Sequence, residues 1–160
     1  MGRRPMITIA YDPSLHVLCG RVSGPQSNAE NEKLLAAVDE LDRDGRAQKH
    51  PVAFMLDLTN NVEPPDAHWR RRFADQRKRL GSPAVFISIV TTSRVLRGVL
   101  TAMNWISPEA PHVKSVHHAT CDESAAWIEQ VHGAPAAAVR NLLTRKPASP
   151  TTNAGSGPGP

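Results

Sequence analysis

The sequence predicts an α/β domain with a mostly parallel sheet of about five strands, and three observations support this prediction. Residues 52–58 and 84–90 are short apolar runs, typical of central strands that are covered on both faces. Segments with helical apolar spacing lie between and after these runs, so strands and helices alternate along the chain. Two strand-like segments, 6–11 and 15–22, precede the first helix and predict an antiparallel hairpin at the edge of the sheet.

The hairpin and the first helix are marked by turn and capping residues. Residues 12–14, Asp-Pro-Ser, favour a tight turn because proline sets φ and the aspartate can bond its own backbone. Gly20 indicates a bulge or a close backbone approach inside the second strand. Ser27, or the asparagine after it, is expected to cap the helix, with Glu30 at capping-box spacing from the serine. Gly45 is expected to end this helix.

The remaining elements follow from the same signals. They are helices at 66–80, 94–106 (capped by Ser93) and 136–143, a short strand at 113–117, and a fourth helix capped by Asp122. The chain is thus divided into a flexible N-terminus (1–5), a single domain (6–144) and a tail rich in proline, glycine and serine (145–160). The tail cannot build a core and is expected to be disordered.

Composition narrows the class of protein. A length of 160 residues, with 40% hydrophobic and 21% charged residues, fits one globular domain. The two cysteines, Cys19 and Cys121, lack the spacing of a zinc or redox site and are expected to be reduced thiols. The chain shows neither a signal-peptide pattern nor an apolar run long enough to span a bilayer, so a cytoplasmic location is expected.

Familiar catalytic and metal-binding motifs are missing from the sequence. It contains neither a nucleophile elbow nor a phosphate-binding glycine loop. His117 and His118, adjacent on a strand, would point to opposite faces and could not easily chelate one ion. We therefore expect a non-enzymatic protein without cofactor or metal. Asp57, at the end of a central strand, and the nearby Thr59 are candidate regulatory residues because α/β folds place functional groups there.

Helix 66–80 carries six positive charges within ten residues. Trp69, Phe73 and Leu80 form its inward stripe, and the basic residues cover the rest. This surface is either a solvated cationic face or a docking site for an acidic protein, a lipid headgroup or a nucleic-acid phosphate. Nucleic acid is the least favoured because the aromatic spacing suits core packing. The candidate partner-binding residues are Arg70, Arg71, Arg77 and Lys78.

Helix 94–106 combines an apolar side with one polar line. The expected apolar side consists of Val95, Leu96, Val99, Leu100, Met103 and Ile106. Arg94, Arg97, Thr101 and Asn104 follow one another along one line and are candidate ligand-binding residues. The two arginines lie near the first turn, where the helix dipole disfavours them, which indicates an anionic partner: a carboxylate of this chain or a bound ligand. Gly98 costs roughly 1 kcal/mol against alanine in mid-helix, and such a cost is usually tolerated where another backbone packs close.

The order of elements resembles the STAS/SpoIIAA-like fold, and three segments resemble bacterial SpoIIAA-like (STAS/SEC14-type) proteins. These segments are 54–59 (FMLDLT), 94–106 (RVLRGVLTAMNWI) and 122–128 (DESAAWI), and the resemblance covers residues 6–132. It implies a regulatory role, which in STAS antagonists acts through a serine at the helix start after the central strand. Residues 57–66 contain no matching serine motif. SEC14-like relatives carry an apolar ligand pocket, so the resemblance also implies lipid or acyl binding.

Two functional hypotheses follow. The leading one is a non-enzymatic regulatory or protein-interaction module that docks a partner protein through the basic helical surface. The alternative is a SEC14-like binder of a fatty-acyl or other small anionic amphiphilic ligand, with Arg94 or Arg97 at the headgroup. A homodimer is a further option.

Overall fold

The computed structural model describes residues 7–60 and 63–145. The expected flexible N-terminus (1–5) lies outside the described residues, as does the expected disordered tail apart from its first residue, Arg145. The fold described below therefore belongs to the expected single domain.

In the described part of the chain, five strands form one mixed sheet, and their order in space equals their order in the sequence. Strand β1 (Ile7–Asp12) pairs antiparallel with β2 (Val17–Val22). Strands β3 (Val52–Asp57), β4 (Val85–Val90) and β5 (Val113–His118) continue the sheet in parallel. The predicted α/β class, with a mostly parallel sheet and an opening antiparallel hairpin, is confirmed.

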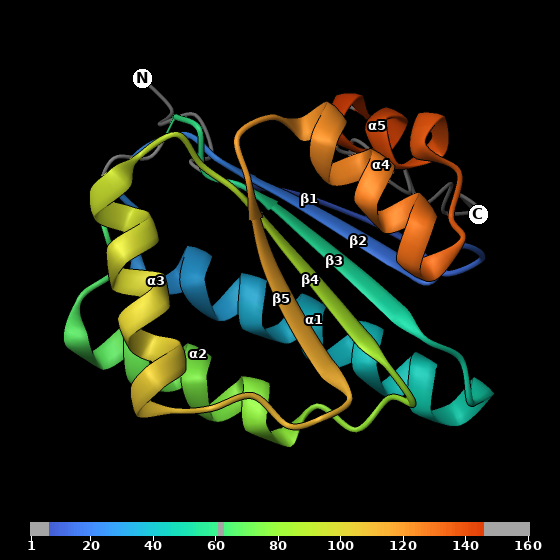
Figure 1. Cartoon of the computed structure of the whole chain (residues 1–160), viewed down its shortest axis with the longest axis horizontal. Helices are drawn as coiled ribbons and strands as arrows, with labels where there is room; N and C mark the ends of the chain where they lie inside the picture. Colours follow the sequence, from blue (N-terminus) through green and yellow to red (C-terminus); the bar gives the residue numbers. More distant parts are fainter. Residues whose placement is uncertain (1–6, 61–62, 146–160) are drawn as a thin grey trace, which may run out of the picture.

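Within residues 7–60 and 63–145, five helices cover the two faces of this sheet. They are α1 (Asn28–Gln48), α2 (Ala67–Arg79), α3 (Arg94–Ile106), α4 (Cys121–His132) and α5 (Ala136–Thr144). Figure 1 shows α1, α2 and α3 on one side of the sheet and α4 with α5 on the other. The grouping follows from chirality, because three right-handed crossovers that advance in one direction place their helices on the same face. None of the helices in the described ranges is long and apolar enough to cross a membrane.

Each face of the sheet has its own core because successive strand residues point to opposite sides. The face under α1, α2 and α3 is filled by large side chains such as Leu18, Phe54 and Ile89. The face under α4 and α5 is filled by smaller ones, with Ala53 and Ala125 among them. The α4–α5 layer can therefore approach the sheet closely.

Two glycine predictions are resolved by close contacts. The prediction that helix α1 ends at Gly45 is wrong. The helix continues to Gln48 and is capped by Lys49 in the left-handed conformation. Gly45 is buried, and a Cβ there would overlap side-chain atoms of Val52 and Ser82. Gly20 lies in a regular strand pairing and not in a bulge. An added Cβ at Gly20 would come within 3.1 Å of Leu56 Cδ1.

The predicted caps are confirmed at two helices and wrong at a third. Ser27 and Glu30 form the expected capping box of α1, and Ser93 caps α3. The cap of α4 is Thr120, whose hydroxyl accepts a hydrogen bond from the backbone N–H of Glu123, and not Asp122. The carboxylates of the first turn still favour this helix end because they lie near its positive pole.

Candidate functional site

A cavity of about 150 Å³ lies between the sheet and the layer formed by α1, α2 and α3. Its wall on the sheet side comes from alternate residues of β3, β4 and β5, and its other wall comes from the three helices. The apolar lining consists of Leu34, Val38, Phe54, Leu56, Leu58, Pro65, Phe73, Leu80, Ile87, Ile89, Leu96, Leu100 and Met103. The cavity is thus mainly an apolar space within the larger of the two cores.

Polar groups line the side of the cavity next to β5 and the end of α3. The guanidinium of Arg77 donates to Asn104 Oδ1 (2.6 Å) and to the backbone oxygen of Ser107 (3.2 Å), and it forms an ion pair with Glu109 (3.4 Å). The other carboxylate oxygen of Glu109 accepts a hydrogen bond from the backbone N–H of Ser115. This chain of contacts, called the polar pole below, ties α2, α3 and β5 together.

Ser115 and His117 extend the polar pole along β5. The Ser115 hydroxyl is buried and has no hydrogen-bond partner among the described residues. Burial lowers the pKa of His117, and the positive charge of Arg97 lowers it further while Glu109 opposes this. A neutral imidazole and an unpaired hydroxyl therefore face the cavity from one strand. Buried polar atoms without partners, such as the Ser115 hydroxyl, are uncommon in native proteins, so this hydroxyl is suited to bind a polar part of a ligand, with the His117 ring beside it.

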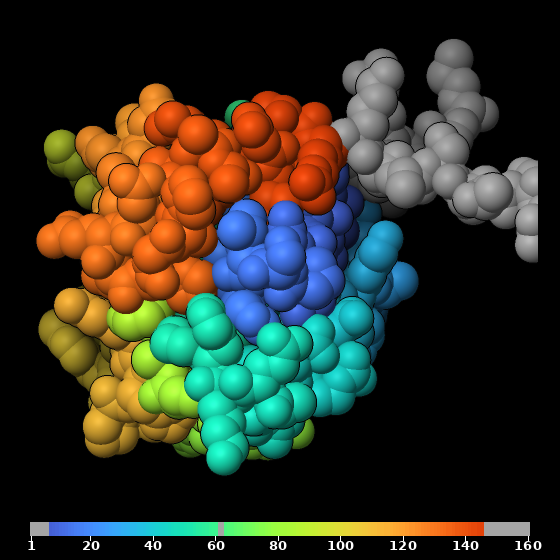
Figure 2. Space-filling model, turned by 90° about the vertical axis from the view of Figure 1, so that its right-hand side faces the viewer, coloured from blue at the N-terminus to red at the C-terminus, as the bar shows by residue number. Residues whose placement is uncertain are grey.

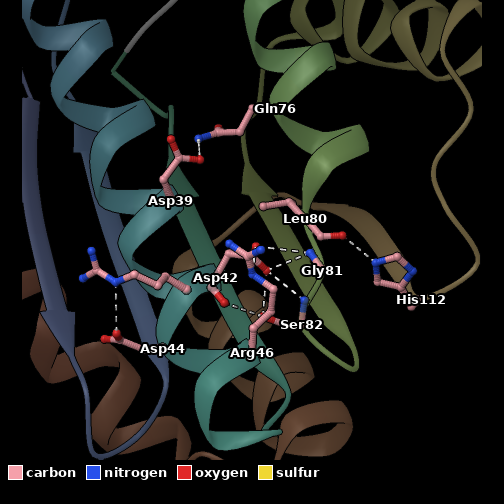
Figure 3. Close-up of polar contacts among 10 residues, drawn as sticks. Asp39, Asp42, Asp44, Arg46, Gln76, Leu80, Gly81, Ser82 and His112 are labelled. Carbon is pink, nitrogen blue, oxygen red and sulfur yellow. Dashed lines mark hydrogen bonds and ion pairs between the residues drawn. The ribbon is translucent and has the colours of Figure 1, made fainter.

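The wall formed by α1 and α2 is held in place by a network that we call the Asp42 clamp, shown in Figure 3. The Asp42 carboxylate accepts hydrogen bonds from the backbone N–H groups of Gly81 and Ser82 and from the Ser82 hydroxyl, and it pairs with Arg46. Gln76, which lines the cavity, donates to Asp39. These contacts join α1 to α2 and to the loop between α2 and β4, so several hydrogen bonds hold this wall together.

The wall formed by α3 is attached more loosely. Of its thirteen residues, all within the described part of the chain, only Leu96 is buried. Leu100 and Met103 reach the cavity, whereas Val95 and Ile106 are 67% and 86% exposed. The expectation of one continuous apolar side facing inward is therefore wrong for these two residues. The apolar arc of α3 is wider than the contact that the helix makes with the sheet.

The four residues of the polar line predicted on α3 do not lie together at one site. Asn104 lines the cavity and binds Arg77. Arg94 and Thr101 are exposed, and the Arg97 guanidinium donates to the backbone oxygen of Thr91 (3.0 Å). Arg97 bonds to a neutral carbonyl of its own chain, so the anionic partner expected for this arginine is not found among the described residues. Of the four candidate ligand-binding residues, the structure brings Asn104 to the cavity.

The basic residues of α2 point in different directions. Arg71 and Lys78 are exposed, whereas Arg70 donates to the backbone oxygen of Pro65 (2.8 Å) and Arg77 points into the polar pole. Arg72 pairs with Glu32 of α1 and lies over the Trp69 ring. The four candidate partner-binding residues therefore do not form one continuous surface.

The candidate regulatory residues Asp57 and Thr59 lie at the carboxyl end of β3, where Asp57 binds both Thr59 and Arg21. Asp57 pairs with Arg21 (2.8 Å) and accepts hydrogen bonds from the backbone and the hydroxyl of Thr59. Burial would raise the pKa of Asp57, but the bonds from Thr59 and Arg21 outweigh this effect and lower it. The Cys121 thiol lies beside this network, and its pKa is raised by burial and by Asp57. The arrangement explains how β3 ends without requiring a ligand.

Three histidines meet at the end of the sheet where the β1–β2 turn, the end of α1 and the end of α4 lie together. Figure 2 views this end from outside. There the blue β1–β2 turn lies between the cyan end of α1 and the orange α4–α5 segment. The His16 ring stacks on His50 with centroids 4.1 Å apart, and His50 meets His132 edge-on at 5.7 Å. We call this the histidine cluster. It is not a metal site, since no group of three or more suitable ligands occurs among the described residues.

Comparisons with known proteins add no family to this description. No protein-family model matches the chain, and neither the curated proteins nor the solved structures give a significant match. Function must therefore be argued from the geometry.

Sequence reasoning missed Ser115 and Glu109, and it considered His117 only as a metal ligand, a function that it rejected. The alternation along β5 contained a usable signal, because Val113, Ser115 and His117 share one face. A serine and a histidine on the inward face of a strand predict a polar lining. The cavity itself has no local signature, because it depends on how far α3 stands from the sheet.

Proposed function

We propose that the chain is a ligand-binding module that holds a small, mainly apolar molecule with one polar or anionic group. The cavity supports this proposal, because its lining is apolar except at the polar pole, Ser115 and His117, and near Gln26 and Gln76. Ligand sites are typically apolar pockets with a few placed polar groups. An apolar cavity of about 150 Å³ is large enough to bind benzene.

The size of the cavity refines the acyl-ligand hypothesis. One ring or a short chain fills about 150 Å³, whereas a long fatty-acyl chain needs more room. The Asp42 clamp holds α1 and α2, so a longer ligand would have to displace α3. The apolar pocket implied by the SEC14-like resemblance is in agreement with such a site.

The polar end of the ligand is placed beside Arg77, Asn104 and Ser115 in this proposal, and not beside Arg94. The Ser115 hydroxyl has no acceptor, and a carboxylate or hydroxyl of the ligand would supply one. Arg97 adds a positive charge near His117, while the charges of Arg77 and Glu109 largely cancel. A ligand with a single negative charge therefore complements this end of the cavity.

The first test fills the cavity. Octanoate, 1-octanol and benzene are titrated into the full chain, and binding is followed by NMR chemical shifts. Leu100→Trp places an indole in the cavity and is expected to weaken binding at least about tenfold, roughly 1.4 kcal/mol. Thr101→Trp, at the exposed neighbouring position, is the matched control and should bind like the parent chain. If none of the three probes gives a saturable shift, the proposal fails.

A second candidate function is docking of an acidic partner protein, supported by Arg71 and Lys78. Both are exposed on α2 and show no partner among the described residues. The double variant Arg71→Glu, Lys78→Glu should lose partners recovered by pull-down without a change in thermal stability. The same changes at Arg70 and Arg77 would also break internal contacts, so those residues are unsuitable for this test. Unchanged recovery by the double variant contradicts this function.

A further inference from the structure

Helix α3 has a second apolar face that points away from the cavity. Val95, Trp105 and Ile106 are 67%, 81% and 86% exposed, and they are the large hydrophobic residues with high exposure in the described ranges. Gly98 and Ala102 lie between them on the same side, because positions 95, 98, 102 and 105 or 106 follow helical spacing. An exposed apolar surface of this kind usually marks an interaction site.

Gly98 has no explanation within the described chain. A Cβ at this position would meet no atom within 4 Å, so no neighbouring element requires the glycine. Glycine in the middle of a helix costs stability relative to alanine, and it is tolerated where another backbone approaches closely. The described residues therefore leave open space beside Gly98, into which a second helix could pack closely.

We propose that α3 is a homodimer interface and packs antiparallel against α3 of a second copy, with the twofold axis near Ala102. In this arrangement, residues equally far before and after Ala102 oppose each other. Ile106 then lies over Gly98 of the partner copy, and Trp105 covers the adjacent surface. The large side chains at one end of the helix fill the space left by the small residue at the other end, so the surface is complementary to itself.

Charge complementarity favours this occupant. Arg94 and Arg97 lie in the first turn of α3, which contains no acidic residue, and the last turn contains no basic one. The dipole of the helix itself disfavours arginine at this end. An antiparallel partner places its C-terminal turn, with the negative end of its dipole, within reach of Arg94, whereas Arg97 bonds to Thr91 of its own chain. The C-terminal end of α3 in each copy thus attracts the positive charge at the N-terminal end of α3 in the other copy.

The interface is expected to be modest in size. A helix of thirteen residues is about 20 Å long, and one pair of such helices buries less than the roughly 800 Å² per partner of a standard interface. Interfaces of this size are typical of weak, transient association, so the dimer is expected to form reversibly as the concentration rises. This inference concerns the outward face of α3 and does not depend on a ligand in the cavity.

Sedimentation of the full chain from about 1 µM to about 1 mM tests the proposal. The parent chain should shift from monomer to dimer. Ala102→Glu brings two carboxylates together at the twofold axis and should weaken the dimer at least about tenfold. Ala126→Glu, the same change at an exposed position of α4, is the matched control and should not alter the equilibrium.

Two further measurements locate the interface and its orientation. Trp105 emission should shift to the blue as the concentration rises, and Trp105→Phe should abolish this shift. Trp69 is already buried, and Trp127 lies on α4, where it packs against Phe86 and His118 on the other side of the sheet. Under oxidising conditions, Ala102→Cys should form a symmetric cross-linked dimer, whereas Ala126→Cys should not.

Each contrary outcome overturns the proposal. A parent chain that stays monomeric at every concentration excludes the dimer, and co-sedimentation of that monomer with phosphatidylglycerol vesicles would assign the face to a lipid surface. A dimer that is insensitive to Ala102→Glu lies elsewhere on the molecule. A dimer that is sensitive to Ala102→Glu but does not cross-link through Ala102→Cys has a different orientation.

Discussion

At the scale of single residues, Gly45 and Gly98 both lie inside helices but in opposite surroundings. Gly45 is buried where α1 passes Val52 and Ser82, and a side chain there would overlap both. Gly98 is exposed, with open space where a side chain would stand. The same substitution should therefore have opposite effects at the two positions.

We predict that Gly45→Ala destabilises the fold by roughly 1–3 kcal/mol, the usual cost of forcing extra atoms into a packed site. Urea-induced unfolding followed by circular dichroism measures this change. A neutral effect would mean that α1 can move away from β3 without loss, contrary to the close contacts described.

We predict that Gly98→Ala stabilises the monomer by up to about 1 kcal/mol, because alanine favours the helix and meets no steric conflict. The unfolding free energy is measured at a concentration where the chain is monomeric. The added methyl should also weaken the dimer proposed for α3, so the two effects have opposite signs. Destabilisation of the monomer would contradict the open space at this position.

Residues with local functions were predictable from the sequence, and residues with distant partners were not. The Ser27–Glu30 capping box and the Ser93 cap use neighbours within three residues, so their spacing reveals them. The function of Gly45 depends on Val52 and on the more distant Ser82, which its own helical pattern cannot show.

At the scale of elements, the Asp42 clamp joins α1 to the loop that precedes β4 through hydrogen bonds across some forty positions of sequence. His112 adds a contact from the α3–β5 loop to the backbone oxygen of Leu80 (2.7 Å). One wall of the cavity is thus fixed by buried polar contacts. The opposite wall, α3, depends mainly on Leu96 and the polar pole.

We predict that Asp42→Ala destabilises the protein by roughly 1–3 kcal/mol, because the buried N–H of Ser82 loses its acceptor. Asp39→Ala removes an exposed carboxylate from the same helix and serves as the control, with a smaller effect. Chemical denaturation gives both values. Equal losses for the two variants would show that the clamp has no special importance.

Element-level prediction succeeded where one face of a helix decides its packing. The stripe of α1 formed by Leu34, Leu35, Val38 and Leu41 is buried as predicted. The same kind of prediction failed on α3, because the apolar residues of this helix cover more of its circumference than the sheet can contact. Periodicity identifies an apolar surface, but it does not show which part of a wide surface faces the chain's own core.

At the scale of the whole molecule, the histidine cluster connects the hairpin, the end of α1 and α4. Burial lowers the pKa of His16 and of His132, and neighbouring imidazoles lower both further, while Asp44 opposes this at His16 and the Pro51 carbonyl opposes it at His132. The folded state therefore prefers these rings neutral. In the unfolded chain they titrate near about 6.5.

We predict that the free energy of unfolding falls as the pH drops below about 6.5, since the unfolded chain then binds more protons at these histidines than the folded protein does. His16→Asn should reduce this dependence, because asparagine accepts the positive φ of 54° at this position but does not titrate. His68→Asn, on the exposed side of α2, leaves the cluster intact and should retain the slope. Unfolding midpoints in urea between pH 5 and 7.5 provide the measurement. A slope unchanged by His16→Asn would assign the acid sensitivity to other groups.

The directions of the strands were predictable, because a hairpin joins antiparallel strands and a strand–helix–strand unit joins parallel ones. Their order in space was not, because a right-handed crossover decides which face its helix covers but not which strands are neighbours. The cavity was not predictable, because it arises from the distance between layers that no local pattern encodes.

Because the strands are arranged in space as they are in sequence, each new strand emerging from the ribosome can pair with the one made just before it. The sheet can therefore grow in one direction while its α1–α3 face is covered step by step. The other face, with Val17, Met55 and Val90, remains uncovered until α4 and α5 have been synthesised. Premature termination before α4 would leave an apolar sheet surface open to aggregation, so synthesis of the last two helices completes the protection of the nascent protein.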